Sequence, residues 1–99
     1  MSEDAPKPGE GPTKEERETG FYDVHFIGET ARGEKIRTQC KGDKDPGYGS
    51  TCKMIAESAI CLVRDAKDAK GGIWTPAAAM AAPLLKRLIA HAGLTFGRE

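Results

Sequence analysis

The chain has no excess of charge of either sign, no long apolar run and few aromatic residues, and each absence excludes a class of protein. Its 99 residues contain 15 Lys or Arg and 15 Asp or Glu. No basic stripe with interleaved aromatics occurs, so we expect no nucleic-acid binding. Charge interrupts every apolar stretch well before the ~18 residues that a membrane span requires, and residues 1–11 are too polar for the core of a signal peptide. We therefore expect a cytoplasmic protein without membrane contact.

Cysteines are few and unpaired. Cys40, Cys52 and Cys61 are odd in number and lack CxxC spacing, which disfavours a disulfide framework, a zinc site and a dithiol redox motif. They are expected to be small reduced core residues. Cys52 could instead be a nucleophile in the first turn of a helix, but a catalytic thiol needs a base, and His25 and His91 lie on other predicted elements. We predict no catalytic residue and no metal site.

The first part of the chain divides into an arm and the start of a domain. Residues 1–12 hold three prolines and two glycines without a large apolar side chain, so a flexible arm is expected. The domain is expected to span 13–99. Thr13 and Glu16 fit a capping box for a short helix over 14–19, and Gly20 is expected to end it in the left-handed region.

Two stretches show the alternation of half-buried strands. In residues 21–29 apolar side chains alternate with polar ones, and the same period recurs over 35–41. The intervening residues 30–33 suit a hairpin loop in which Gly33 takes a positive φ. These features predict an antiparallel hairpin.

Two amphipathic helices are predicted next. Over 50–68 apolar residues recur every three or four positions and make a face broader than one hairpin can cover. A second helix begins with Thr75 as N-cap and Pro76 at the first position, and ends at Gly93. Pro83 lies inside it and predicts a kink or break near 79–82.

Residues 94–96 then form a short apolar strand, most simply a third member of the sheet. The fold class is therefore α+β, a small antiparallel sheet of a hairpin plus a C-terminal strand, with two main helices packed on one face. Trp74, before the second helix, is expected to anchor the crossover against the sheet, or else to line an interface or ligand wall.

The segment 44–51 is the candidate binding loop. Asp45-Pro46-Gly47 fits a type II turn. The following residues place flexible backbone and hydroxyl groups at a helix N-terminus, where free N–H groups attract a carboxylate or phosphate. The candidate substrate-binding residues are Tyr48, Gly49, Ser50 and Thr51. The alternative is that the loop is only a turn and a helix cap.

Several ordered blocks resemble a known family. They are Asp45-Pro46-Gly47-Tyr48, Thr51-x-Lys53-Met54-x-Ala56-Glu57-Ser58-Ala59-x-Cys61-Leu62, Gly71-Gly72-Ile73-Trp74-Thr75-Pro76-Ala77-x-Ala79-Met80, Leu84-x-x-Arg87-Leu88 and Gly93-Leu94-Thr95-Phe96. Together they resemble the C-terminal end of saccharopine dehydrogenase-like oxidoreductases, above all the short bacterial members also described as trans-acting enoyl reductases. The resemblance covers roughly 10–97. Pro83 departs from the family pattern, in which a polar or acidic residue is usual.

The resemblance implies a division of labour between domains. Members have an N-terminal Rossmann domain that binds NAD(P) and a second α+β domain that builds a substrate site and often a subunit contact. This chain lacks the strands and glycine fingerprint of a dinucleotide-binding unit. The resemblance therefore implies no cofactor in this fragment, NAD(P) in the full-length protein, and a missing N-terminal Rossmann domain and a second subunit as partners.

Three hypotheses follow. The leading one is a C-terminal substrate-side and interface domain of a saccharopine dehydrogenase-like NAD(P)-dependent oxidoreductase, inactive alone. The second is a free-standing homodimeric interaction module whose apolar faces meet those of a symmetry mate. The third is a small thiol enzyme that uses Cys52.

Overall fold

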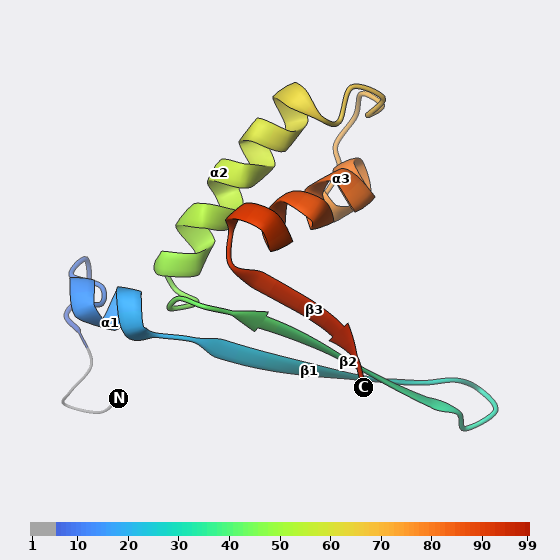
Figure 1. The fold of residues 1–99 in the computed structure, drawn as a ribbon, viewed down its shortest axis with the longest axis horizontal. Helices are drawn as coiled ribbons and strands as arrows, with labels where there is room; N and C mark the ends of the chain where they lie inside the picture. The colour runs from blue at the N-terminus through green and yellow to red at the C-terminus, as the bar shows by residue number, and fades with distance from the viewer. Residues whose placement is uncertain (1–5) are drawn as a thin grey trace.

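The structure is a computed structural model that describes residues 6–99. Residues 1–5 of the expected flexible arm lie outside the described part. The fold is α+β, as predicted, with a three-stranded antiparallel sheet of order β1-β2-β3 and two main helices (Figure 1). The elements are α1 (Lys14–Thr19), β1 (Tyr22–Glu29), β2 (Lys35–Gly42), α2 (Gly49–Arg64), α3 (Pro76–His91) and β3 (Leu94–Arg98).

Helix α1 begins with the predicted capping box. The Thr13 hydroxyl accepts from the Glu16 N–H at 3.2 Å, and the Glu16 carboxylate accepts from the Thr13 N–H at 2.7 Å. The prediction of a left-handed Gly20 is wrong, because its φ and ψ are −62° and 155°. Glycine is required there by space instead: an added Cβ would lie 2.8 Å from both the Asp45 Cβ and the Glu16 carbonyl oxygen.

The hairpin forms as predicted. Strands β1 and β2 pair without a bulge from Tyr22↔Gly42 to Glu29↔Lys35, and Gly33 has a φ of 82° in the loop. Strand β3 pairs antiparallel to β2, which confirms the third strand and extends it to Arg98.

The pairing register separates the sheet into two faces. Cross-strand partners share a face, so the register defines an apolar sheet face that consists mainly of Tyr22, Val24, Phe26, Ile36, Cys40, Leu94 and Phe96. The opposite, polar sheet face carries Asp23, His25, Gln39, Lys41 and Glu99. The predicted alternation is confirmed. The predicted half-burial is wrong along most of β1, whose residues after Tyr22 are all exposed.

Both main helices depart from their predicted outlines. Helix α2 ends at Arg64 rather than at 68, with Asp65 as its C-cap, and Ala66 beyond it packs against the core between the helices. Helix α3 has Pro76 in its first turn as predicted, but the Thr75 side chain makes no capping hydrogen bond. The predicted kink is confirmed at Ala81, where φ is 34° and ψ is −117°.

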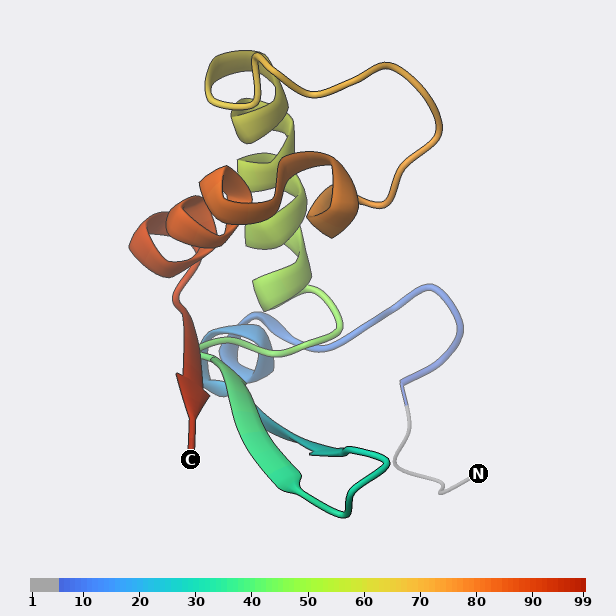
Figure 2. The same cartoon turned by 90° about the vertical axis from the view of Figure 1, so that its right-hand side faces the viewer.

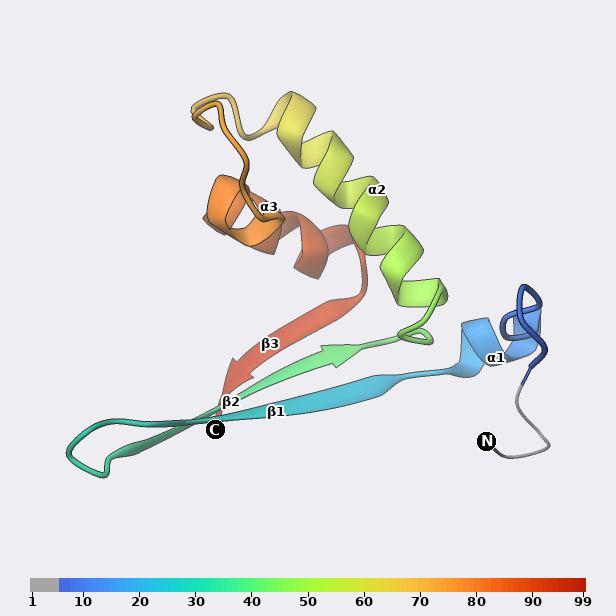
Figure 3. The same ribbon diagram turned by 180° about the vertical axis from the view of Figure 1, so that it is seen from behind.

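The core is small and lies mainly between the helices. Cys61 of α2 packs with Met80 and Leu84 of α3, and Ala92 and Leu94 are buried where α3 turns into β3. Figures 2 and 3 show both helices on one side of the sheet, with α3 crossing α2 and the hairpin tip projecting beyond them. The helices therefore cover only one end of the sheet.

Much apolar surface stays exposed as a result. On the sheet, Val24 is 42% exposed and Phe26 55% exposed. On the helices the most exposed large apolar side chains are Ile55, Leu62 and Val63 of α2 with Leu85 and Ile89 of α3. We call these helix residues, together with the exposed Val24, Phe26, Ile36 and Phe96 of the apolar sheet face, the uncovered apolar surface.

Trp74 does not anchor the crossover on the sheet. Its side chain is 57% exposed, and its indole N–H reaches only the Gly71 carbonyl, at 3.4 Å. The packing prediction for Trp74 is therefore wrong within the described residues. No helix among residues 6–99 is both long enough and apolar enough to span a membrane.

Candidate functional site

The candidate loop folds around the carboxylate of Asp45. That carboxylate accepts from the backbone N–H groups of Gly47 at 2.9 Å, Tyr48 at 3.0 Å and Gly49 at 2.6 Å. The predicted type II turn is wrong, because Gly47 has no positive φ. An aspartate side chain that bonds the backbone two to four residues ahead replaces the backbone turn.

The same contacts also affect the ionisation of the Asp45 carboxyl group. The pKa of Asp45 is lowered, chiefly by the hydrogen bond from the Gly49 N–H and further by those from Tyr48 and Gly47 and by the positive charge of Arg17. The three N–H groups available for an external anion are already bonded to an internal one. The anion-binding interpretation of this loop therefore has no free donors among these amides.

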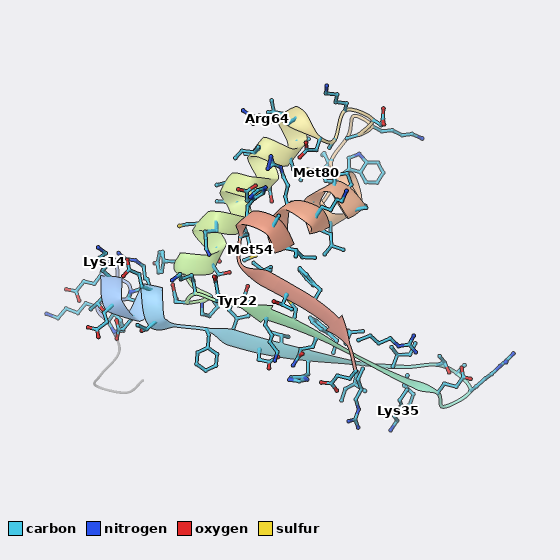
Figure 4. The ribbon with its side chains drawn as sticks, in the orientation of Figure 1. Lys14, Tyr22, Lys35, Met54, Arg64 and Met80 are labelled. Carbon is cyan, nitrogen blue, oxygen red and sulfur yellow. The ribbon has the colours of Figure 1, made fainter. Side chains whose placement is uncertain are left out.

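Ser50 faces inward, toward the sheet. It is fully buried, and its hydroxyl lies 2.9 Å from the hydroxyl of Tyr22. The Tyr22 ring lies across Gly42, where any Cβ would overlap it. Figure 4 shows Tyr22 beneath the first turn of α2. Ser50 thus ties α2 to β1.

A pocket of about 380 Å³ opens on the other side of the loop. Tyr48 and Gly49 line it, together with Arg17, Cys52 and residues 9–12. Ser50 and Thr51 do not line it, and the Thr51 hydroxyl donates to the Pro46 carbonyl at 2.7 Å. The structure therefore brings two of the four predicted residues to one cavity and uses the other two to hold the loop.

Arg17 is a pocket residue that sequence reasoning missed. Its guanidinium donates to the Pro12 carbonyl at 2.8 Å, and its own carbonyl accepts from the Asp45 N–H at 3.3 Å. The sequence carries no signal for this role, because Arg17 and Asp45 are brought together only by the turn from α1 into the sheet.

The structure does not bring His25 to Cys52 as a base for a catalytic thiol. Cys52 is exposed rather than a core residue, which corrects its prediction, whereas Cys61 is buried as predicted. His25 pairs with Asp23 at 3.2 Å and with Glu99 at 2.9 Å on the polar sheet face, away from the pocket. The pKa of Cys40 is raised by burial and by the charge of Asp23, so this thiol is a poorer nucleophile than usual.

The described residues contain neither a metal-ligand cluster nor a Rossmann unit. Residues 6–99 contain no group of three or more His, Cys, Asp or Glu side chains placed to hold a metal ion. NAD(P) binding of the Rossmann type needs parallel strands joined through a helix, but the described sheet is antiparallel throughout. The described residues therefore do not form a Rossmann dinucleotide-binding unit.

A charged cluster that the sequence analysis did not anticipate joins the two helices. Arg87 of α3 donates to Asp65 at 2.6 Å and to Glu57 at 2.9 Å. The side chains of Arg87 and Glu57 are each only 16% exposed. An open hollow of about 780 Å³ lies beside Arg87, but its cation is already paired with two carboxylates. The cluster is therefore interpreted as a structural ion-pair network between α2 and α3.

Comparison with known proteins finds relatives much longer than this chain. The chain is 40% identical over 85 residues to a candidate trans-acting enoyl reductase of Mycobacterium tuberculosis, covering 84% of this chain and 20% of that protein. It is 38% identical over 94 residues to a trans-acting enoyl reductase of the same species, covering 93% and 22%. A trans-acting enoyl reductase of Mycobacterium ulcerans is 39% identical over 85 residues, covering 84% and 20%.

The chain thus spans about a fifth of the length of the curated relatives it matches. No family model matches it, and no solved structure matches it. The resemblance seen in the sequence blocks is confirmed at this level: the chain is related to one segment of trans-acting enoyl reductases.

Proposed function

We propose that the chain is the C-terminal, substrate-side and interface portion of a larger saccharopine dehydrogenase-like, NAD(P)-dependent oxidoreductase, and that it is inactive alone. The observation that carries the proposal is the uncovered apolar surface, in a chain whose relatives are about five times longer. The remainder of the reductase covers this surface and supplies the Rossmann domain that binds the cofactor.

The amount of exposed apolar side chain supports an interface. Ile55 is 69% exposed and Val63 79% exposed on α2, and both belong to a helix that already buries Cys61 against α3. Monomeric proteins seldom leave extended apolar patches in water, and larger patches mark interaction sites. This number of exposed large apolar side chains fits contact with another domain of the same polypeptide.

The pocket beside Tyr48 is the proposed contribution to the substrate site. Tyr48 is 53% exposed, so its ring is available for contact, whereas Gly49 allows close packing, since an added Cβ would lie 2.8 Å from the Arg17 carbonyl oxygen. Ser50, which is buried, and Thr51, which is exposed, fix the loop through their hydroxyl hydrogen bonds. The pocket is open to one side, which suits a wall of a larger cavity completed by another domain.

Hydride transfer is assigned to the missing part of the protein. The antiparallel sheet does not suit NAD(P), so this chain binds and orients and does not itself reduce. We place the reductase in the cytoplasm, where cysteines stay reduced.

The uncovered apolar surface also favours a second candidate function, a free-standing homodimeric interaction module. In that case the apolar surface of one copy covers the same surface of another. Val63→Glu would then break the contact between the apolar surfaces of two copies, and no other domain would be needed for the stability of the chain.

The test is a domain exchange. The segment of a mycobacterial trans-acting enoyl reductase that matches this chain is replaced by this chain, and folding, NADPH binding and enoyl reduction are measured. The proposal expects an active chimera, and Val63→Glu in the chimera is expected to lower folding yield and activity, whereas the matched change Lys67→Glu on an exposed turn leaves both unchanged. Tight, saturable NADPH binding by the isolated chain, or a chimera indifferent to Val63→Glu, contradicts it.

A further inference from the structure

The outer edge of β1 is open, and the strand is neither short, nor interrupted by proline, nor bulged. β1 is the terminal strand of the sheet, and its only partner among residues 6–99 is β2. Edge strands are commonly guarded by shortness, proline, lysine or a bulge. β1 has eight residues, YDVHFIGE, with no proline or lysine and with a continuous register. The other edge strand, β3, has five residues and contacts α3.

The register fixes which backbone groups face that edge. The Thr30 N–H donates to the Glu34 carbonyl at 2.9 Å, directly in line with the β1–β2 ladder. Hydrogen-bonded pairs alternate along an antiparallel ladder, so the even-numbered residues of β1 bond to β2. The N–H and C=O groups of Asp23, His25 and Ile27 therefore point to the open edge.

We propose that this edge pairs with the β1 edge of a second copy of the chain, antiparallel and two-fold symmetric, with Val24 opposite the partner's Val24. This register places Asp23 opposite the partner's His25, Tyr22 opposite the partner's Phe26 and Phe21 opposite the partner's Ile27. The result is a continuous six-stranded sheet across the dimer.

Charge and shape select this register over its neighbours. The neighbouring two-fold registers shift the alignment of the two strands by two residues, because a shift of one residue would place each side chain opposite one on the other face. One step in one direction puts Asp23 opposite Asp23, and one step in the other puts His25 opposite His25. Two carboxylates directly opposite each other destabilise a pair, whereas a carboxylate opposite an imidazole can accept a hydrogen bond from its N–H. The register centred on Val24 is the one of the three in which an acidic residue faces a histidine.

The same register accounts for two exposed apolar side chains on the polar sheet face. Ile27 is 67% exposed and shares the polar sheet face with Asp23 and His25. Phe21 directly precedes β1 and is 79% exposed, and continued alternation places it on the same face. The helices cannot reach them, because they lie on the opposite side of the sheet. Cross-strand contact between an aromatic and a β-branched residue is a favourable pair. The proposed dimer forms two such pairs.

This inference does not rest on the proposed function. The edge is separate from the uncovered apolar surface, so a reductase segment and a free-standing module could each pair in this way. Glutamate at Val63 is expected to leave edge pairing intact.

The first test is sedimentation equilibrium of the 99-residue chain. A reversible dimer is expected. His25→Pro is expected to weaken association about thirty-fold or more, because each copy loses one edge N–H donor and gains a ring in the path of the partner strand. His25→Thr keeps the N–H and is the matched control, with only a few-fold loss. A monomeric chain, or a His25→Pro dimer as tight as the original, overturns the proposal.

A second test reads the register directly and does not depend on proline. Val24→Cys and Gly28→Cys are each made with Cys40 and Cys52 replaced by serine. Opposed residues of a non-hydrogen-bonded pair lie close enough for a disulfide, so Val24→Cys is expected to form covalent dimers on mild oxidation. Gly28 lies far from the partner's Gly28 in this register. Gly28→Cys is therefore expected to run as a monomer in denaturing electrophoresis without a reducing agent. Equal cross-linking of both variants, or none at Val24, overturns the register.

Discussion

The base of α2 and the uncovered apolar surface are built in opposite ways. At the base, glycines let segments approach closely: Gly20 lies against Asp45, and Gly42 lies under the Tyr22 ring. The polar groups there are satisfied, with the Ser50 hydroxyl on Tyr22 and three N–H groups on Asp45. The apolar surface a few residues away has large side chains in water and no partner in the described chain.

The difference shows which contacts the chain makes alone and which it leaves to something else. A chain of about this length buries only a little over ~60% of the surface of its unfolded state, so it can complete one tight region. It completes the base of α2. The remaining apolar faces gain stability only when another surface covers them.

The largest expected effect comes from filling the space under Tyr22. Gly42→Ala forces the ring away and breaks its bond to Ser50, and we expect a loss of about 2–3 kcal/mol in the free energy of unfolding. Urea denaturation followed by circular dichroism measures it. Gly28→Ala is the matched control, since the nearest atom to an added Cβ there is the Ile36 carbonyl oxygen at 3.9 Å. Equal losses in both variants would show that the base of α2 is not specially packed.

A smaller loss is expected when the Tyr22 hydroxyl alone is removed. In Tyr22→Phe the ring stays, but the buried Ser50 hydroxyl loses its partner, at a cost of about 1 kcal/mol. The control is Tyr48→Phe, which removes a hydroxyl from an exposed ring and should leave stability unchanged. If Tyr22→Phe is also neutral, the bond from β1 to α2 contributes nothing.

As the pH falls, the contacts at the base of α2 are expected to weaken before the contacts between the helices. The folded-state pKa of Asp45 is lowered by the N–H of Gly49 first and by Tyr48, Gly47 and Arg17. Its stabilisation is therefore complete above the unfolded pKa of about 3.9 and is lost as pH falls through the lower folded value. Asp45→Asn should flatten the dependence of unfolding free energy on pH between neutral and acid conditions. The residual slope is expected from Glu16, whose pKa is lowered by its bonds to Thr13.

The smallest effect is expected on the apolar sheet face. Phe26→Thr removes a side chain that is 55% exposed, so the isolated chain should change in stability by no more than about 0.5 kcal/mol. Thermal unfolding measures this, and the same substitution in the domain-exchange chimera is expected to cost more. A large loss in the isolated chain would mean that Phe26 packs in a region that the structure leaves open.

The sequence predicted the helices and strands better than it predicted which of their side chains are buried and what they contact. Alternation and helical periodicity located the hairpin, both helices, the third strand and the kink before Pro83, because these signals are local. Burial failed along β1 and at Trp74, because it depends on what packs above the sheet. The turn at Asp45-Pro46-Gly47 was misjudged because a side chain, not a glycine φ, satisfies its backbone.

The candidate site was only partly predictable for the same reason. Tyr48 and Gly49 line a pocket, and the loop was located by its glycines and hydroxyls. That Ser50 turns inward to Tyr22 depends on a contact between residues 28 positions apart. Arg17 of α1 lies beside the pocket because the chain turns between α1 and the sheet. The sequence has no periodic signal for that turn.

The measurement that tests the central claim most directly is the labelling rate of an introduced cysteine at Val63. With Cys52 replaced by serine, Val63→Cys is treated with a thiol reagent in the isolated chain and in the domain-exchange chimera, and Lys67→Cys serves as an exposed reference. We expect Val63→Cys to react as fast as the reference in the isolated chain and about tenfold or more slowly in the chimera, because the apolar surface is then covered. Equal rates in the chimera and the isolated chain would contradict the account.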